Sequence, residues 1–396
     1  MPTSAQQEST HHESIYHESI YHEEHEAFRR SVRAFLAKEV VPHFPEWEAA
    51  GCVPHELYQR LGDLGMLGLR VPAEYGGGGE GGFLYSSVWS EECARAGVSL
   101  GGAATHMNLV IPYILREGTE EQKRRWLPDM AAGRRMGAIA MTEPGTGSDL
   151  AGIRTTARLE GGHWVLSGGK TFITGGINAD LVVVVARTSE HADRRAGLSL
   201  LVVDADSEGF GRGRNLEKIG LKATDTAELF FDDVAVPADH LLGEEGQAFR
   251  YLAHNLVQER LGIALGSQVS AEKALRITLS YVKDRTAFGQ PVSSFQNTKF
   301  KLASCHVEVT AGRALLDRAM RAHEAGRLTA AEASAVKVYC TETQNRVIDR
   351  CLQLHGGYGF MREYEIARMF TDARISRIYG GTNEVQRVII AKSLGL

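Results

Sequence analysis

The stretch Met141-Thr-Glu-Pro-Gly-Thr-Gly-Ser-Asp149 separates two parts of the chain that follow different patterns. Before it, apolar residues recur with the period of an amphipathic helix, as at Val32 and Phe35. After it come short β-branched and apolar runs, such as Leu181-Val-Val-Val-Val-Ala186, which glycine, aspartate and proline separate. The helical period returns near Gly246 and holds to the C-terminus. The order α, β, α predicts three consecutive regions and not alternating βαβ units.

Each region is expected to contain several short elements. The predicted N-terminal helices cover 57–64, 84–96, 101–116 and 119–132, and Thr119 with Gln122 forms a capping box for the last. The predicted strands cover 164–167, 181–186, 198–203 and 227–231. The expected domains are a tail over 1–23, an α-helical domain over 24–140, a β domain over 141–245 and an α-helical domain over 246–396. No G-x-G-x-x-G motif opens a strand–helix unit, which argues against a nicotinamide site.

The composition is that of an ordinary globular protein. The chain has 396 residues, 43% of them hydrophobic and 23% charged, which is typical of two or three domains with a sizeable core. The formal net charge of −5 gives no indication of a nucleic-acid partner or an anionic membrane surface. No apolar run approaches the roughly 20 residues that span a bilayer. The N-terminus has no basic region leading into an apolar one, so neither a secretory signal nor a transit peptide is expected.

The cysteines and the first residues carry little functional information. The five cysteines are scattered and lack Cys-x-x-Cys spacing, which favours small buried residues in a reduced, cytoplasmic compartment. The repeat in residues 12–22, with histidines between acidic and apolar residues, could suggest a metal-binding tract. A duplicated, partly disordered tail is the preferred interpretation, and no metal site is predicted.

The loop 141–149 is the first candidate for a binding site. Two glycines and a proline leave backbone N–H groups free, and Thr142, Thr146 and Ser148 add hydroxyl donors. Such a loop can cradle a phosphate or the edge of a polar heterocycle. An ordinary interdomain turn explains the same residues equally well, so composition alone leaves both interpretations open.

Five motifs in order carry a resemblance to the acyl-CoA dehydrogenase family. They lie at 142–149, 170–176, 284–296, 353–359 and 377–387, and the resemblance extends from Glu24 to Leu396. It implies an α+β fold with an N-terminal α-helical domain, a middle β-barrel or sandwich domain and a C-terminal four-helix-bundle domain. The strings Gln258-Glu-Arg-Leu261 and Ile378-Tyr-Gly-Gly-Thr-Asn-Glu384 look most similar to the long-chain subgroup.

The resemblance implies FAD as the cofactor, held by residues from two subunits. Residues expected to contact FAD from one chain are Met141, Thr142, Gly147, Ser148, Phe172 and Thr174, and Thr382 and Glu384 are expected to complete the FAD contacts. Residues expected to reach the FAD of a neighbouring subunit are Arg285, Phe288, Gln296, Gln353, Gly356 and Gly357. Within the motifs expected to bind FAD, three positions depart from the usual family residues, since Phe172 replaces tryptophan, Gly175 replaces asparagine and Glu384 replaces glutamine.

The catalytic base of most family members is missing from its usual place. In those members a glutamate precedes the Gly-Thr pair, but this chain has Gly380 there, which can still supply a backbone N–H. Glu259 matches the second place at which the long-chain and isovaleryl subgroups carry their base. Positions 259, 262 and 266 share one helical face, and glycines at the last two leave a shallow groove beside the carboxylate. From the residues alone, the preferred interpretation of Glu259 is an exposed ion-pair partner on a helix that packs through its glycines, and the resemblance favours the base instead.

The implied reaction is α,β-dehydrogenation of a saturated acyl-CoA to the trans-2-enoyl-CoA. Glu259 takes the α-proton and a hydride passes to flavin N5, with Ser148, Arg260, Tyr379 and Gly381 as substrate contacts. The absence of a side chain at Gly380 predicts a medium to long, or branched, acyl chain. The expected assembly is a homotetramer or at least a dimer, with an electron-transfer flavoprotein as acceptor. Two alternatives remain: a flavin oxygenase or oxidase on the same fold, and a non-catalytic subunit that binds FAD or acyl-CoA.

Overall fold

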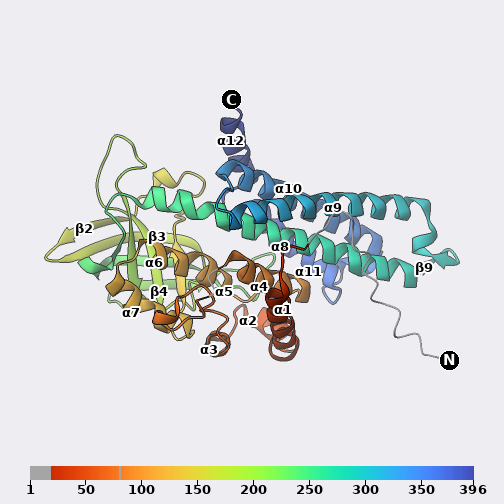
Figure 1. Ribbon diagram of the computed structural model, residues 1–396, viewed down its shortest axis with the longest axis horizontal. Coiled ribbons are helices and arrows are strands. Elements are labelled where there is room, and N and C mark those ends of the chain that lie inside the picture. The colour runs from red at the N-terminus through yellow and green to blue at the C-terminus, as the bar shows by residue number, and fades with distance from the viewer. Residues whose placement is uncertain (1–18, 80–81) are drawn as a thin grey trace.

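The computed structural model describes residues 19–79 and 82–396, and it places the expected helical, sheet and helical regions one after another along the chain (Figure 1). The predicted fold class is confirmed. The histidine-containing repeat lies mostly outside the described residues. The sheet forms one end of the molecule, and the longest helices run side by side from it toward the opposite end.

The N-terminal region is built from short helices. Their bounds are Glu23–Phe35 (α1), Phe44–Ala50 (α2), His55–Asp63 (α3), Phe83–Ala96 (α4), Ala103–Thr105 (α5), Ile111–Glu117 (α6) and Glu120–Ala131 (α7). The predicted capping box is confirmed, because Gln122 N donates to Thr119 Oγ1 over 3.2 Å and Thr119 N donates to Gln122 Oε1 over 3.0 Å. The helix expected over 101–116 contains a π-helical turn, His106–Val110. Pro112 follows this turn, and proline cannot donate the usual helical hydrogen bond.

The middle region is a single hydrogen-bonded sheet. Its strands are Gly137–Ala140 (β1), Thr156–Glu160 (β2), His163–Thr174 (β3), Leu181–Arg187 (β4), Leu198–Asp204 (β5), Phe210–Asn215 (β6), Thr226–Pro237 (β7) and Leu241–Leu242 (β8). The order is β6-β7-β3-β2-β4-β5-β8, and β1 pairs in parallel with β4. β1 was not among the predicted strands, and it begins before Met141, the expected start of the β domain.

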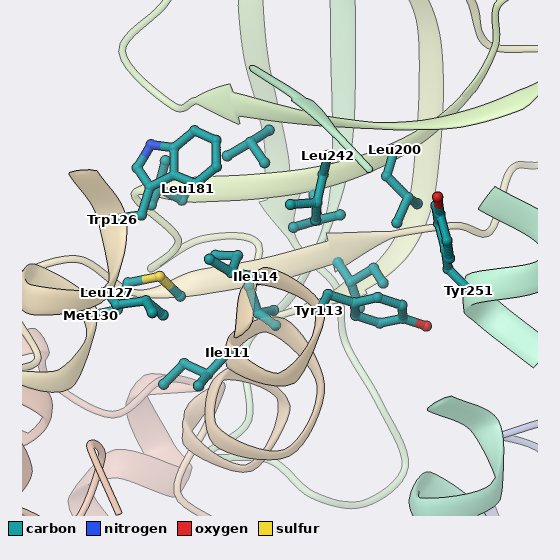
Figure 2. Close-up of a cluster of buried hydrophobic side chains, with 14 of the residues drawn as sticks. Ile111, Tyr113, Ile114, Trp126, Leu127, Met130, Leu181, Leu200, Leu242 and Tyr251 are labelled. Atoms are coloured by element: carbon teal, nitrogen blue, oxygen red, sulfur yellow. The ribbon is translucent and has the colours of Figure 1, made fainter. Parts of the chain in front are cut away.

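The two faces of β4 pack into two different cores. Leu181, Val183 and Val185 join a cluster with the helices α6 and α7, whereas Val182 and Val184 pack inside the sheet region. Figure 2 shows the first cluster, with Trp126, Leu127 and Met130 at one end and Tyr113 and Tyr251 at the other. Because successive side chains of a strand point to opposite faces, an unbroken apolar run is what a strand buried on both faces requires.

The C-terminal region contains the longest helices. Their bounds are Ala248–Asp284 (α8), Gln296–Glu324 (α9), Ala330–His355 (α10), Glu365–Ala373 (α11) and Asn383–Ser393 (α12). A small hairpin of Thr286–Ala287 (β9) and Gln290–Pro291 (β10) joins α8 to α9. The predicted breaks near Gly289, Gly326 and Gly356 are confirmed, and all three glycines have a left-handed φ that favours glycine.

Buried ion pairs hold the N-terminal helices against α8 and α9. Arg29 of α1 and Arg313 of α9 both donate to Glu91 of α4, over 2.7 and 3.0 Å. Arg313 also binds Glu272 of α8, with one bond of 2.7 Å. The four helices therefore share one charge network, and this network fixes α8, which carries Glu259, relative to the N-terminal region.

Candidate active site

The loop 141–149 is tied firmly to β3 on its inner side. Thr171 N donates to Thr142 O over 2.9 Å, and Lys170 Nζ donates to Glu143 Oε1 over 2.8 Å and to Met141 O over 3.1 Å. Lys170 and Glu143 are both buried. The Lys170 ammonium and other donors hold the pKa of Glu143 below its usual range against the opposing effect of burial. The loop and the strand thus form one rigid unit.

The outer side of the same loop is open. Gly147 and Ser148 are exposed, and a Cβ built at Gly145 or Gly147 would meet no other atom within 4 Å. Met141 and Thr142 are half-buried at its base. The four residues predicted to contact a flavin therefore lie in one short segment whose backbone a ligand can approach.

Phe172 stands out on β3 because its side chain is exposed and its backbone is strained. Its φ is 58°, in the left-handed region, and its side chain is 68% exposed, although Thr171 and Ile173 on either side are buried. A β-bulge between Lys170 and Ile173 interrupts the pairing with β7 at this point. Such bulges re-aim a side chain, and the strain, of order 1–3 kcal/mol, is typical of functional sites. Thr174, the other predicted flavin contact, is half-buried at the end of β3.

Glu259 lies on α8, where its carboxylate is half-buried and makes no hydrogen bond or ion pair within the described part of the chain. Burial raises its pKa to about 7, while the positive charges of Arg260 and Lys337 act in the opposite direction. A carboxyl group with a pKa near neutrality is suited to accept a proton at physiological pH. The interpretation of Glu259 as an exposed ion-pair partner is therefore wrong.

Gly380 faces Glu259. A Cβ at position 380 would lie 3.5 Å from Glu259 Oε1 and would overlap the Cδ1 atom of Ile263. Its φ of 63° also favours glycine. Gly262 and Gly266, on the same face of α8 as Glu259, have open space where a side chain would stand. The structure thus brings Glu259, Gly380 and the predicted groove together.

Core packing links this pair to the loop. Met141 packs against the apolar cluster that contains Tyr113, whose pKa is raised by burial and by the charge of Glu259. Tyr113 belongs to α6 and occupies the end of the cluster seen in Figure 2. Tyr113 therefore belongs to the core that Met141 packs against and is also close enough to Glu259 to feel its charge.

The turn 380–382 is held from one side by hydrogen bonds to its carbonyl groups. Gln386 Nε2 donates to Gly380 O over 3.1 Å and to Gly381 O over 2.8 Å, and Lys337 Nζ donates to Gly381 O over 3.0 Å. Thr382 caps α12, where its hydroxyl accepts from Val385 N. In the described chain, the N–H groups of Gly380 and Gly381 have no acceptor. They are available to a ligand.

The other residues predicted near the substrate differ in exposure. Tyr379 is partly exposed, and Glu384 is exposed in the first turn of α12. Arg260 is only 5% exposed, and its Nε has no hydrogen-bond partner in the described chain. A buried guanidinium with an unused donor is suited to an anionic ligand group.

The second group of predicted FAD contacts lies far from Glu259 in the same chain. Arg285 follows α8, and at 1.5 Å per helical residue it is about 39 Å along the axis from Glu259. Its guanidinium lies 5.4 Å from the ring centre of Tyr358, beside the turn that contains Gly356 and Gly357. The exposed residues Phe288, Gln296 and Gln353 lie in the β9–β10 turn, at the start of α9 and near the end of α10. In Figure 1, β9 marks the end of the helices farthest from the sheet.

Sequence comparison identifies the family. Family models described as the acyl-CoA dehydrogenase N-terminal, middle and C-terminal domains match residues 22–134, 138–234 and 246–395. The chain belongs to the acyl-CoA dehydrogenase family. The long-chain specific acyl-CoA dehydrogenase, mitochondrial, of Sus scrofa is 48% identical over 94% of this chain and 86% of its own length. The resemblance inferred from the five motifs is thereby confirmed, as is an acyl-CoA dehydrogenase oxidoreductase as the enzyme class.

Solved structures of acyl-CoA dehydrogenases agree in fold. An acyl-CoA dehydrogenase from Geobacillus kaustophilus has a TM-score of 0.94 and 49% identity, over 95% of this chain and 99% of the other. One from Bacillus anthracis, complexed with FAD, has a TM-score of 0.86 and 33% identity, over 95% of this chain and 68% of the other. The family is FAD-dependent. No helix among the described residues is both long and apolar enough to cross a membrane.

Sequence reasoning missed the residues that hold the site from behind. Lys337, Gln386 and the Lys170–Glu143 pair were not predicted, although each makes hydrogen bonds to a predicted site segment. A sequence signal for Lys337 exists, because it stands in an otherwise buried helical pattern with Ala333, Val336 and Cys340. A lysine at such a position requires an internal partner.

Proposed function

We propose that the chain catalyses α,β-dehydrogenation of a saturated acyl-CoA to the trans-2-enoyl-CoA, with Glu259 as the base. The observation that carries this proposal is the position of Gly380, whose absent side chain would point at the Glu259 carboxylate from 3.5 Å. The Glu259 carboxylate on α8 therefore lies in the same region of the site as the glutamate that most relatives carry at position 380.

FAD is the proposed cofactor, and the open loop and the exposed Phe172 fit a flat aromatic ring. Met141, Thr142, Gly147 and Ser148 offer backbone and hydroxyl donors, and the phenyl ring of Phe172 offers an apolar wall. FAD supplies the chemistry of accepting the β-hydrogen as hydride when it is bound. The strained backbone at Phe172 is explained by a ligand that needs this side chain outside the core.

The chain's own residues handle the proton and the thioester oxygen. Glu259 accepts the α-proton, and negative charge develops at the thioester carbonyl oxygen as that proton leaves. The free N–H groups of Gly380 and Gly381 are suited to stabilise this charge, as preorganised backbone donors do. Loss of the side chain at position 380 leaves these donors in place, and it leaves room beside the substrate Cα for a longer or branched acyl group.

The proposed assembly is a homo-oligomer in which FAD binds across an interface. The separation of about 39 Å along α8 between Glu259 and Arg285 supports this, because a single cofactor site could use both residues of one chain only if it extended over that distance. Phe288 lies three residues after Arg285, just beyond the end of α8, and its side chain is 96% exposed. A large exposed apolar side chain at this place is suited to contact with another subunit. An electron-transfer flavoprotein as acceptor, a role in fatty acid oxidation and a cytoplasmic location remain predictions.

The test is anaerobic reduction of the purified yellow protein by a panel of straight, branched and aromatic acyl-CoA thioesters. The proposal expects bleaching of the flavin by saturated medium to long or branched chains. Clear preference for butyryl-CoA would contradict the expected chain length. Absence of bleaching by every thioester, with rapid reoxidation of chemically reduced flavin by air, would favour the oxygenase alternative. A protein that binds an acyl-CoA but never bleaches would be a non-catalytic subunit.

A further inference from the structure

Lys337 is a fully buried lysine on α10 behind the 380–382 turn. Its ammonium group donates to Gly381 O over 3.0 Å and to Asn383 Oδ1 over 2.9 Å. No carboxylate lies within ion-pair distance of it in the part of the chain that the structure describes. A buried charge without an ion-pair partner is unfavourable for stability, so its position suggests a role beyond packing.

Lys337 and Gln386 together fix the direction of the turn. Gln386 binds the carbonyl oxygens of Gly380 and Gly381, and the Ser334 hydroxyl of α10 donates to Gln386 Oε1 over 2.8 Å. In a trans peptide the carbonyl oxygen and the following N–H point in opposite directions. The bond to Gly380 O therefore turns the Gly381 N–H away from the network, and the bonds to Gly381 O turn the Thr382 N–H away from it. Hydrogen bonds in series polarise one another, so Gln386 on Gly380 O strengthens the Gly381 N–H as a donor, and Lys337 on Gly381 O strengthens the Thr382 N–H.

The same ammonium group is electrostatically coupled to Glu259. The charged and titratable groups that face Glu259 are Arg260 on its own helix, Lys337 on α10, Tyr113 on α6 and Tyr379 before α12. Arg260 and Lys337 lower the pKa of Glu259 against the effect of burial. Burial and the nearby Arg260 lower the pKa of Lys337 to about 8, and Glu259 opposes this shift.

Two further carboxylates act on Lys337 from a greater distance. Glu384 in the first turn of α12 and Glu342 on α10 both raise its pKa. Glu342 is already engaged, since it accepts from Asn383 Nδ2 over 2.9 Å and from Arg377 Nη2 over 2.7 Å. Glu384 pairs with Arg387 over 3.7 Å, so Glu259 is the one of these acids that makes neither a hydrogen bond nor an ion pair in the described chain.

We propose that Lys337 is a positioning residue for the dehydrogenation inferred above: its hydrogen bond to Gly381 O holds the 380–382 turn in the orientation that leaves the N–H groups of Gly380 and Gly381 free for the thioester oxygen. The same bond places its positive charge at the turn that faces Glu259, where a Cβ at position 380 would lie 3.5 Å from Oε1. The inference rests on the proposed function. Lys337 exchanges no atoms in the reaction. The α-proton goes to Glu259, and the substrate loses its β-hydrogen with two electrons to the oxidised flavin, which is reduced.

The experiment compares three substitutions of Lys337 in the FAD-loaded enzyme. Lys337→Met removes both charge and donors, Lys337→Gln keeps donors without charge, and Lys337→Arg keeps both. The rate of anaerobic flavin reduction by a saturating acyl-CoA is measured from about pH 6 to about pH 9, a range that includes both the wild-type and the shifted midpoint of the base. Lys38→Met, a change at a side chain that is 81% exposed, is the matched control.

The charge-removing variants are expected to move the midpoint of the pH profile upward by about half a unit to one unit, because a favourable charge beside Glu259 is lost. Lys337→Met is also expected to lose about 10-fold or more of the limiting rate, as when one oriented donor is lost. Lys337→Arg and Lys38→Met are expected to keep the wild-type midpoint. If Lys337→Met fails to fold, the comparison of Gln with Arg gives the same test.

Three results would overturn the proposal. A lower rate and melting temperature with an unchanged pH midpoint in the Met and Gln variants would make Lys337 a structural residue only. A midpoint that shifts equally in Lys337→Arg would exclude its charge as the cause. Loss of folding in all three variants would assign it to stability alone. Failure of the wild-type protein to reduce flavin with any acyl-CoA is a separate result, which refutes the proposed function itself.

Discussion

Moving the carboxylate from position 259 to position 380 tests whether both positions serve one reaction site. The perturbation is Glu259→Gln combined with Gly380→Glu, and with Ile263→Val because the Cδ1 atom of Ile263 overlaps the Cβ of any side chain at 380. Valine lacks that atom. The new Cβ then starts 3.5 Å from the former position of Glu259 Oε1, so a glutamate side chain there reaches the same space.

We expect two changes in the rate of flavin reduction and one change in stability. Removing the base alone should slow flavin reduction by roughly 10²–10⁴-fold. The triple variant should regain at least about 10-fold over Glu259→Gln and stay below wild type, because its carboxylate approaches from another direction. Stability should fall by about 1–2 kcal/mol, since position 380 has a φ of 63° that a non-glycine residue adopts unfavourably.

The assay is anaerobic stopped-flow bleaching of the flavin by an acyl-CoA panel, with FAD content measured for each variant. The matched control carries Gly380→Gln in place of Gly380→Glu, since it has the same shape without a base. Glu121→Gln, at an 81% exposed side chain, controls for loss of a carboxylate elsewhere. Equal recovery with glutamine and glutamate, or no recovery in a triple variant that binds FAD and substrate, would refute the reasoning.

Four further predictions concern stability and cofactor retention. The pKa of Glu259 is raised from 4.5 to about 7 on folding, so the stability of the folded protein falls as pH rises between these values. Glu259→Gln should therefore raise the free energy of unfolding by about 1–2 kcal/mol at about pH 8 and leave it unchanged at about pH 4. Urea titrations at both pH values check this. The Phe172→Gly variant should be about 1 kcal/mol more stable than Phe172→Ala in thermal melts of the apoprotein, because glycine adopts the left-handed φ at this position without strain. Equal stability of the two variants would contradict the presence of backbone strain at Phe172. Lys170→Met should lower the free energy of unfolding by about 3–5 kcal/mol, because it leaves the Glu143 carboxylate buried without its cation. Denaturant unfolding checks this, with the double variant Lys170→Met/Glu143→Gln as a control that should lose less stability. In the Arg285→Ala variant, FAD should be lost and the oligomer should dissociate, as size-exclusion chromatography with flavin absorbance measures. Loss of FAD from an intact oligomer, or dissociation with FAD retained, would count against a site shared between subunits.

The order of regions could be predicted because it depends on local patterns. The unbroken apolar run at 181–186 predicted a strand, and the structure shows why it must be apolar throughout, with one face on helices and the other inside the sheet. The capping box at Thr119 was also predicted, since both partners lie within one turn. Strand β1 was not, because Gly-Ala-Ile-Ala has weak β-propensity and exists as a strand through its pairing with β4.

The site could be predicted in part, and the missing part depends on tertiary contacts. Glu259 and Gly380 are separated widely in sequence, and family resemblance suggested their relation before the structure placed them face to face. The left-handed backbone of Phe172 comes from a bulge against β7, which no local pattern indicates. The partners of Lys337 lie in the 380–382 turn and at the start of α12, more than 40 residues away in sequence, so its role behind the turn became visible only in the structure.

The most direct test of Glu259 as the base is a single-turnover comparison of wild type with Glu259→Gln. Both FAD-loaded proteins are mixed anaerobically with the acyl-CoA that wild type reduces fastest, and substrate binding is measured for both. The account predicts equal FAD content and similar substrate affinity, with flavin reduction slower in the variant by roughly 10²–10⁴-fold. Reduction of the Glu259→Gln flavin at the wild-type rate would contradict it.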